Sequence, residues 1–365
     1  MENAINNLSQ QLVAPSAIES ELMLLWQKLA KENKIRASLF NLIVFHHLSD
    51  RTDYIRTTVQ KVVSLFPCRI LFITYDPNAT HPYLKTAISV VTPTGGDGSV
   101  ACDQIDIGVG APTSLEPVPS LLLPHLIPDL PIYLLWTEDP TKPHPLFAPL
   151  ISLATRAIFD SESTCDLVAF ADTLLTLKEK QKIDIGDLNW ARTEGWRDLI
   201  ASLFSLSEER KQLDKISVIR FIYNERPTPS FCHLKIQSLY LLSWLSSRLN
   251  WSFQAAHPSL YFQFDQIDAK IEGTTWEKLG SGTVIGVHLH TKDGYLFRAE
   301  RIPTSYHQVK VEVSNPEKCE LPYPFMLGKT ATGQSLVKEI CTQGTSDHYL
   351  KMLSTLKILD RDKRI

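Results

Sequence analysis

The pattern of apolar and polar positions predicts alternating strands and helices in the first half of the chain. Residues 39–45 and 70–75 are short, almost wholly apolar runs, which indicate strands covered on both faces. Between them, Ile55 and Val59 lie at helical spacing behind Asp50, which is predicted as the helix cap. A strand, a helix and a strand in this order favour a right-handed parallel crossover.

Further elements of the first half follow from the same periodicities. Ser16 with Glu19 forms a capping-box pattern, which predicts a helix that starts there and buries Leu22 and Leu29. Alternation in residues 104–109 predicts a half-exposed edge or hairpin strand. Other predicted strands are residues 86–92 and 132–136, and other predicted helices are residues 146–155 and 167–180.

The second half has a different pattern, in which strict alternation dominates. A strand is predicted at residues 216–223 and a long helix at residues 234–249, with Tyr240 and Trp244 on its flanks. Lys292-Asp293-Gly294 is a hairpin signal. The remaining predictions are strands at 260–264, 285–289, 295–302 and 309–313, and helices at 334–341 and 347–359.

Length and pattern together predict two domains. At roughly 150 residues per domain, a chain of 365 residues is about right for two. The charged stretch of residues 178–184 places the boundary near Asp184. We therefore expect an α/β domain at residues 1–184, Rossmann-like with a mixed, mostly parallel sheet, and an α+β domain with an antiparallel sheet at residues 185–365.

Composition narrows the classes of function. Apolar residues make up 44% and charged residues 21% of the chain, which is the balance of packed globular proteins. The net charge of −3 offers no field that would concentrate nucleic acid. The apolar runs are much shorter than the roughly 20 residues that span a bilayer, and the first residues do not resemble a signal peptide. We expect a cytoplasmic protein that binds neither nucleic acid nor membrane.

Glycine-rich segments do not predict a cofactor site. A phosphate-binding loop needs glycines at the start of a helix. Residues 95–98 lie between two predicted strands, and residues 280–286 precede a strand, so both are predicted as connections. Residues 332–335 precede a helix, but any helix start presents free amides. No cofactor is predicted.

Histidines offer two places where chemistry is conceivable. His46, His47 and Asp50 follow a predicted buried strand, where α/β sheets hold ligands, yet adjacent strand residues point to opposite faces. His288 and His290 share one face of a strand but lack a third metal ligand. We interpret both pairs as structural, and no catalytic or metal-binding residue is predicted.

The six cysteines do not form a motif. They are scattered and never spaced as C-x-x-C, so neither a zinc site nor a dithiol pair is predicted. The alternative is a redox-sensing pair brought together by the fold. The cysteines are residues 68, 102, 165, 232, 319 and 341.

An aromatic and basic segment is the candidate partner-binding surface. Trp190, Arg192, Trp196 and Arg197 lie close together in the sequence, and tryptophan and arginine are enriched in interface hot spots. The competing interpretation is that both tryptophans fill a core while the arginines cover it.

Four segments in a fixed order resemble the OpcA family of glucose-6-phosphate dehydrogenase assembly proteins. They are RTDYIR to PCRILF at residues 51–72, LIPDLPIYLLW at 126–136, DLNWARTEGWR at 187–197 and LSWLSSRLNW at 242–251. The resemblance implies a non-catalytic assembly factor or allosteric activator of glucose-6-phosphate dehydrogenase in the oxidative pentose phosphate pathway. The alternatives are a sugar-phosphate enzyme of the same pathway, such as a lactonase, with His46, His47 and Asp50 in its site, and a metabolite sensor.

Overall fold

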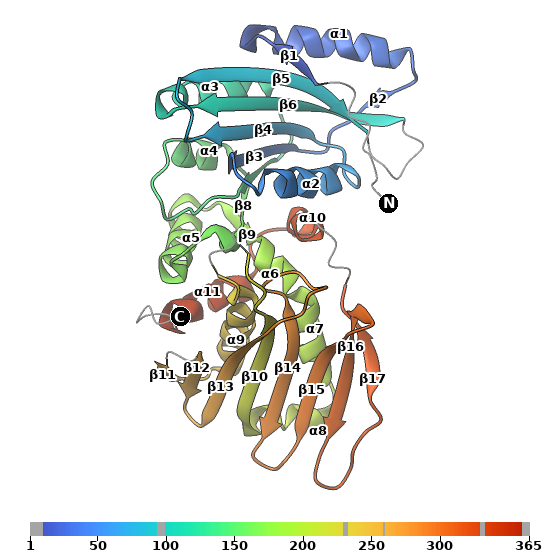
Figure 1. The fold of residues 1–365 in the computed structure, drawn as a ribbon, viewed down its shortest axis with the longest axis vertical. Coiled ribbons are helices and arrows are strands. Elements are labelled where there is room, and N and C mark those ends of the chain that lie inside the picture. Colours follow the sequence, from blue (N-terminus) through green and yellow to red (C-terminus); the bar gives the residue numbers. More distant parts are fainter. Residues whose placement is uncertain (1–9, 93–98, 229–232, 258–259, 329–332, 360–365) are drawn as a thin grey trace. The chain divides into compact units, whose positions relative to one another are not determined.

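The structure, a computed structural model, describes residues 10–92, 99–228, 233–257, 260–328 and 333–359 (Figure 1). The chain divides into two compact units that each combine separate segments. The first unit comprises residues 1–160, 182–186 and 331–344, and the second comprises residues 161–181, 187–330 and 345–365. The boundary near Asp184 stays a prediction.

The first unit contains a mixed sheet flanked by helices. Its strand order within the described ranges is β1-β5-β6-β4-β3-β7-β8-β9, with β2 beside β6. Its strands are β1 (Gln11–Val13), β2 (Ile35–Arg36), β3 (Asn41–His47), β4 (Arg69–Asp76), β5 (Tyr83–Val91), β6 (Val100–Gly110), β7 (Ile132–Trp136), β8 (Arg156–Phe159) and β9 (Asp184–Asp187). Its helices are α1 (Ile18–Ala30), α2 (Thr52–Val63), α3 (Val118–Leu122), α4 (Phe147–Leu153) and α10 (Gln334–Cys341).

The order of the central strands confirms the α/β prediction. β6, β4, β3, β7 and β8 pair in parallel, whereas β5 is antiparallel to both of its neighbours. Read from β6 to β9, the strands follow the 3-2-1-4-5-6 order of dinucleotide-binding sheets, with β3 as the first strand. The carboxyl end of β3 is therefore the place at which such a sheet holds a ligand.

Burial explains why β3 occupies the centre. Leu42 through Phe45 are fully buried, so this strand has the continuous apolar sequence that a parallel sheet covered on both faces requires. α2 buries Ile55, Val59 and Val62, as its periodicity predicts. α10 packs on α2, and Gly333 at its start lies so close to α2 that an added Cβ would be 2.5 Å from the Cβ of Lys61.

Two local predictions for the first unit are wrong, and a third is confirmed in one of its alternatives. Residues 104–109 belong to a hairpin strand, because β6 pairs antiparallel with β5. β6 is not an edge strand, since it lies between β4 and β5, and it is mostly buried instead of half-exposed. Ser16 lies in a 3-10 turn, and α1 begins after Ala17 without a side-chain cap. Asp50 does not cap α2 either, because Arg51 occupies the cap position.

The second unit combines a sheet with helices. The strand order in its described part is β11-β12-β13-β10-β14-β15-β16-β17. Its strands are β10 (Ile216–Asn224), β11 (Phe253–His257), β12 (Tyr261–Phe264), β13 (Ile267–Thr274), β14 (Val284–Thr291), β15 (Leu296–Ile302), β16 (Ser305–Ser314) and β17 (Tyr323–Met326). Its helices are α5 (Leu167–Gln181), α6 (Leu188–Arg192), α7 (Glu194–Leu203), α8 (Ser207–Arg210), α9 (Ile236–Leu249) and α11 (Asp347–Leu359).

The prediction of an antiparallel sheet is wrong for one pair of strands. β10 and β13 are parallel, while the other neighbouring strands are antiparallel. The chain leaves β10, passes through α9 and returns by β11 and β12, and this long connection permits a parallel pair. The sheet is therefore mixed.

α9 is more deeply buried than its sequence indicates. It packs on β10, β13 and α11, and Figure 1 shows α7 and α9 on one side of the sheet. Tyr240 is fully buried and Trp244 is 9% exposed, so their predicted position on the flanks of the helix is wrong. In the part of the chain that the structure describes, no helix is both long and apolar enough to cross a membrane.

Candidate functional site

The turn after β3 differs from a dinucleotide-binding loop. A phosphate there requires glycines so that backbone amides can approach it. Here the turn reads Leu48-Ser49-Asp50-Arg51. Arg51 donates through Nη2 to Asp160 at 2.6 Å, and both side chains are largely buried. These residues do not fit a nicotinamide cofactor.

His46 is a buried structural residue. Its Nδ1 lies 2.8 Å from the carbonyl oxygen of His47, and its Nε2 lies 3.0 Å from Oγ1 of Thr74. Nδ1 therefore carries the proton and Nε2 accepts from the threonine hydroxyl. Burial lowers the pKa of His46 to about 4. This residue has no nitrogen left for a ligand.

His47 and His144 meet at the carboxyl end of the sheet. His47 donates its backbone N–H to Glu138 at 2.8 Å, and its Nδ1 lies 3.3 Å from the other oxygen of that carboxylate. The ring centroids of His47 and His144 are 5.6 Å apart, with the ring of Tyr75 beside both. Nε2 of each histidine is buried and has no hydrogen-bond partner within the described ranges.

The two Nε2 atoms have opposite hydrogen-bonding roles. Nδ1 of His144 accepts from the backbone N–H of Leu146 at 3.2 Å, so Nε2 of the neutral ring carries the proton and is a donor. Burial lowers the pKa of His144 to about 4, which keeps the ring neutral near pH 7. Nδ1 of His47 faces the Glu138 carboxylate and carries its proton, so Nε2 of a neutral His47 is an acceptor. A hydroxyl group complements such a pair, because it both donates and accepts.

The buried histidine predicts a loss of stability in acid. The folded-state pKa of His46, about 4, lies below its ordinary value of 6.5, so the folded protein binds fewer protons between these values. The contribution of His46 is fully present above about pH 6.5 and is lost as the pH falls towards 4, by about 2–3 kcal/mol. Urea unfolding at several pH values should show that His46→Asn flattens this pH dependence relative to the unaltered protein. An identical slope in both proteins would contradict the assignment.

The predicted aromatic and basic segment packs inside the second unit. Trp196 is 2% and Trp190 is 8% exposed. The guanidinium of Arg197 lies 3.5 Å from the centroid of the Trp190 ring and donates to the carbonyl of that residue at 2.7 Å. Arg192 donates to Glu162 at 2.6 Å and keeps 19% of its side chain exposed. Trp190 therefore packs against the guanidinium of Arg197, and the role of this surface in binding stays a prediction.

A buried carboxylate organises the start of this segment. Asp187 is fully buried, caps α6 through the backbone N–H of Asn189 at 2.6 Å, and accepts from Ser161 at 2.9 Å. The hydroxyls of Tyr240 and Tyr349 donate to its other oxygen at 2.7 and 3.3 Å. The local sequence does not indicate the two tyrosines, which come from α9 and α11.

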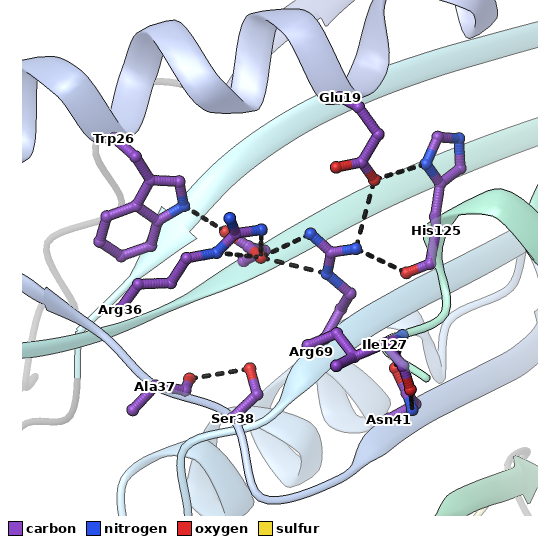
Figure 2. Close-up of polar contacts among 10 residues, drawn as sticks. Glu19, Trp26, Arg36, Ala37, Ser38, Asn41, Arg69, His125 and Ile127 are labelled. Atoms are coloured by element: carbon purple, nitrogen blue, oxygen red, sulfur yellow. Dashed lines mark hydrogen bonds and ion pairs between the residues drawn. The ribbon is translucent and has the colours of Figure 1, made fainter. Parts of the chain in front are cut away.

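The first unit contains a second buried carboxylate that the sequence analysis missed. Asp103 on β6 is fully buried and accepts from Trp26 Nε1 at 2.5 Å. Its other oxygen, Oδ2, accepts hydrogen bonds from two arginines (Figure 2). Arg36 donates through Nε and Nη2 at 3.0 and 2.6 Å, and Arg69 donates through Nε and Nη2 at 3.1 and 2.9 Å. The sequence signal is weak, because the same strand also carries Gln104 and Asp106.

Arg69 extends this cluster to a further loop. Its Nη1 donates to Glu19 on α1 at 3.2 Å and to the carbonyl of His125 at 2.7 Å, and Glu19 also contacts Nδ1 of His125 at 2.7 Å (Figure 2). The cluster joins α1, β2, β4 and β6, so it holds this helix against the sheet. It offers no position for a reaction, because each carboxylate faces cations of the chain itself.

The second histidine pair lies on the sheet of the second unit. Nε2 of His288 contacts Glu300 at 2.8 Å, and His290 lies beside it on the same face. Burial and the neighbouring His288 and Arg220 lower the pKa of His290. Within the described ranges, no group of three potential ligands can hold a metal ion.

The described cysteines fall into two groups. Cys68 and Cys102 are fully buried, and burial raises the pKa of both thiols, that of Cys102 to about 11, which opposes thiolate chemistry. Cys165, Cys319 and Cys341 are exposed, and the described cysteines are not joined in disulfides. The sixth cysteine, Cys232, lies outside the described residues.

The glycine-rich segments are described only in part. The structure does not describe residues 95–98 or Thr332. Gly280 and Gly282 precede strand β14, as predicted.

Family models match both halves of the chain. Residues 59–176 match the model for the N-terminal domain of the glucose-6-phosphate dehydrogenase subunit, and residues 183–353 match the model for its C-terminal domain. The chain belongs to the OpcA family. This confirms the resemblance that the four sequence segments indicate.

Curated relatives of this chain carry the name OpcA. The protein of Nostoc punctiforme named OxPP cycle protein OpcA is 28% identical over 190 residues, which are 51% of this chain and 38% of that protein. The protein of the same name from Synechocystis sp. is 30% identical over 190 residues, with the same coverage of 51% and 38%. The chain thus covers well under two thirds of the length of these relatives.

The chain is similar to solved structures in fold, but their sequence identity to it is too low to indicate more than the fold. The transcriptional regulator Gal80p from Kluyveromyces lactis is 7% identical, with a TM-score of 0.51 over 92% of this chain and 94% of that chain. KijD10, a 3-ketoreductase from Actinomadura kijaniata, is 9% identical, with a TM-score of 0.50 over 90% and 96%. One of these proteins is an enzyme and the other a regulator, so the fold does not decide the function.

Proposed function

We propose that this chain is a non-catalytic cytoplasmic partner of glucose-6-phosphate dehydrogenase that promotes its assembly or its active state in the oxidative pentose phosphate pathway. The observation that carries the proposal is that family models described as domains of a subunit of this dehydrogenase match both halves of the chain. The turn after β3 supports a role without cofactor chemistry, because Arg51 is paired with Asp160 where a dinucleotide fold has glycines.

Binding alone is sufficient for such an activity. A protein that binds the active state of an oligomer more tightly than the inactive state shifts the population by its differential affinity. A preference of about 1.4 kcal/mol changes the ratio of the two states tenfold. Surface complementarity is then the only property that the partner requires.

The direct test is a titration of glucose-6-phosphate dehydrogenase from the same organism with this chain. We expect a saturable rise in dehydrogenase activity and co-elution of the two proteins in gel filtration. The chain alone is the control and should not reduce NADP⁺ with glucose 6-phosphate. Unchanged activity together with separate elution would overturn the proposal.

The arginines of the second unit are the proposed contact residues. We expect Arg197→Gln to raise the dissociation constant for the dehydrogenase about tenfold or more, as at an interface hot spot. Asp198→Asn is the matched control, because Asp198 is exposed beside it. Isothermal titration calorimetry gives the dissociation constant of each variant for the dehydrogenase. The melting temperatures of the variants show whether they remain folded. Equal affinities for a folded Arg197→Gln variant and the unaltered protein would remove this residue from the interface.

A second candidate function is that of a metabolite sensor or a sugar-phosphate enzyme such as a lactonase. The observation in its favour is the donor and acceptor pair of Nε2 atoms on His144 and His47, which complements a hydroxyl group. Thermal shift with glucose 6-phosphate and 6-phosphogluconate tests binding, and turnover of 6-phosphogluconolactone tests catalysis. A shift that His144→Phe abolishes supports a sensor, and the absence of both signals excludes this candidate.

A further inference from the structure

One face of the sheet in the second unit carries charged side chains instead of helices. Along β13, β10, β14, β15 and β16, one set of alternate side chains is buried, as Phe221 and Phe297 show. The ring of Phe297 packs on that of Phe204, which directly follows α7. Alternate residues point the other way. Arg220, Lys270 and Arg298 on that outer face have side chains that are 47%, 45% and 42% exposed.

Three strands of this face each carry a cation and an anion two residues apart. Lys270 contacts Glu272 at 2.7 Å on β13, and Arg298 contacts Glu300 at 2.8 Å on β15. Lys310 and Glu312 form the same kind of pair on β16. Residues two apart on a strand lie on the same face, separated by about 7 Å along the strand.

The strand register aligns these pairs into two rows across the sheet. The first row is Lys270, Arg220, His288, Arg298 and Glu312. The second row is Glu272, Ile222, Gly286, Glu300 and Lys310. Each charged pair therefore has one member in each row, with the signs reversed on β16.

This arrangement is complementary to itself. A two-fold axis that lies in the plane of the face, between the rows, exchanges the first row of one molecule with the second row of another. Lys270 then faces Glu272 of the second copy, and Arg298 faces Glu300 of the second copy. Lys310 likewise faces Glu312 of the second copy. At the centre, His288 faces Gly286 of the second copy, over which the side chains of Glu300 and Ile222 of that copy lie.

The flat area of the face approaches that of a specific contact. Five strands about 4.8 Å apart and about eight residues long cover roughly 24 by 27 Å. The flat area is therefore on the order of 650 Å², and protruding side chains add to the accessible surface. Specific interfaces bury about 800 Å² on each partner. A partner of uniform charge would match only one of the two rows, whereas a second copy matches each ion pair.

We propose that the outer face of β13, β10, β14, β15 and β16 is the interface of a symmetric dimer, in which the two charged rows of one chain meet the opposite rows of a second copy. The interface is isologous, because the same residues contribute on both sides. It forms from the chain alone and needs no other protein.

Complementary charge variants test the dimer. Glu272→Lys with Glu300→Lys makes both rows predominantly cationic, and Lys270→Glu with Arg298→Glu makes both rows predominantly anionic. We expect the unaltered chain to sediment as a dimer and each double variant as a monomer, with the dissociation constant raised at least tenfold. An equimolar mixture of the two variants should sediment as a heterodimer, because cations then face anions.

A swap within one strand provides the matched control. Lys270→Glu with Glu272→Lys reverses one pair and leaves the face complementary to itself, so it should remain dimeric. Circular dichroism and melting temperature show that each variant is folded. A monomeric unaltered chain at tens of micromolar, or dimers in both same-charge variants, would overturn the proposal.

Discussion

Replacing Asp103 by asparagine is expected to lower the free energy of unfolding by about 3–5 kcal/mol, the usual result of leaving one partner of a buried ion pair alone. Asp103 is fully buried, and its carboxylate accepts hydrogen bonds from Arg36, Arg69 and Trp26. The side chain of Arg69 is only 5% exposed, so its charge has little access to water when the carboxylate is removed. Urea unfolding followed by circular dichroism measures the change.

Two comparisons separate this effect from a general loss of charge. Glu208→Gln is the first control, because it removes the anion of the exposed ion pair with Lys211. Such pairs contribute about 0–1 kcal/mol, so we expect the free energy of unfolding to fall by no more than that. Arg36→Met should have a smaller effect than Asp103→Asn, because the side chain of Arg36 is 42% exposed. A change below about 1 kcal/mol for Asp103→Asn would show that the cluster does not stabilise this part of the first unit.

Replacing Asp187 by alanine is the second large effect that we expect, at about 3–5 kcal/mol. The change removes the cap of α6, which contributes about 1 kcal/mol. It also leaves the buried hydroxyls of Tyr240 and Ser161 without this acceptor, at about 1–3 kcal/mol each. Hydrogen exchange should show faster exchange of the amide of Asn189, which donates to Asp187.

Tyr240→Phe provides the matched comparison for Asp187. It removes one donor and keeps the aromatic ring, so we expect about 1 kcal/mol. A loss for Asp187→Ala no larger than that for Tyr240→Phe would mean that the carboxylate does not organise this region.

The sequence predicted elements best where the pattern was long or strongly bounded. β7, α10 and α11 have the predicted bounds, because their apolar periodicity begins and ends abruptly. β17 was missed because Pro322 and Pro324 obscure its pattern, although an edge strand tolerates proline. The caps at Ser16 and Asp50 were wrong because each helix starts one or two residues later, within a turn that local rules do not resolve.

The candidate site was only partly accessible to sequence reasoning. The place of His46 and His47 at the end of β3 follows from the strand pattern. Their surroundings do not, since Glu138 and His144 follow β7, about ninety residues further along the chain. The parallel pairing of β10 with β13 depends in the same way on the route of the intervening chain.

The interleaved construction of the two units has a consequence for synthesis of the chain. α10 lies near the end of the sequence, yet it packs on α2 and supplies Glu339, whose carboxylate contacts buried Arg156 at 2.5 Å. The first unit therefore completes its core only after most of the second unit has left the ribosome. For the same reason, a fragment of residues 1–184 would retain Arg156 without its counter-ion, so cutting the chain once does not yield two self-sufficient folding units.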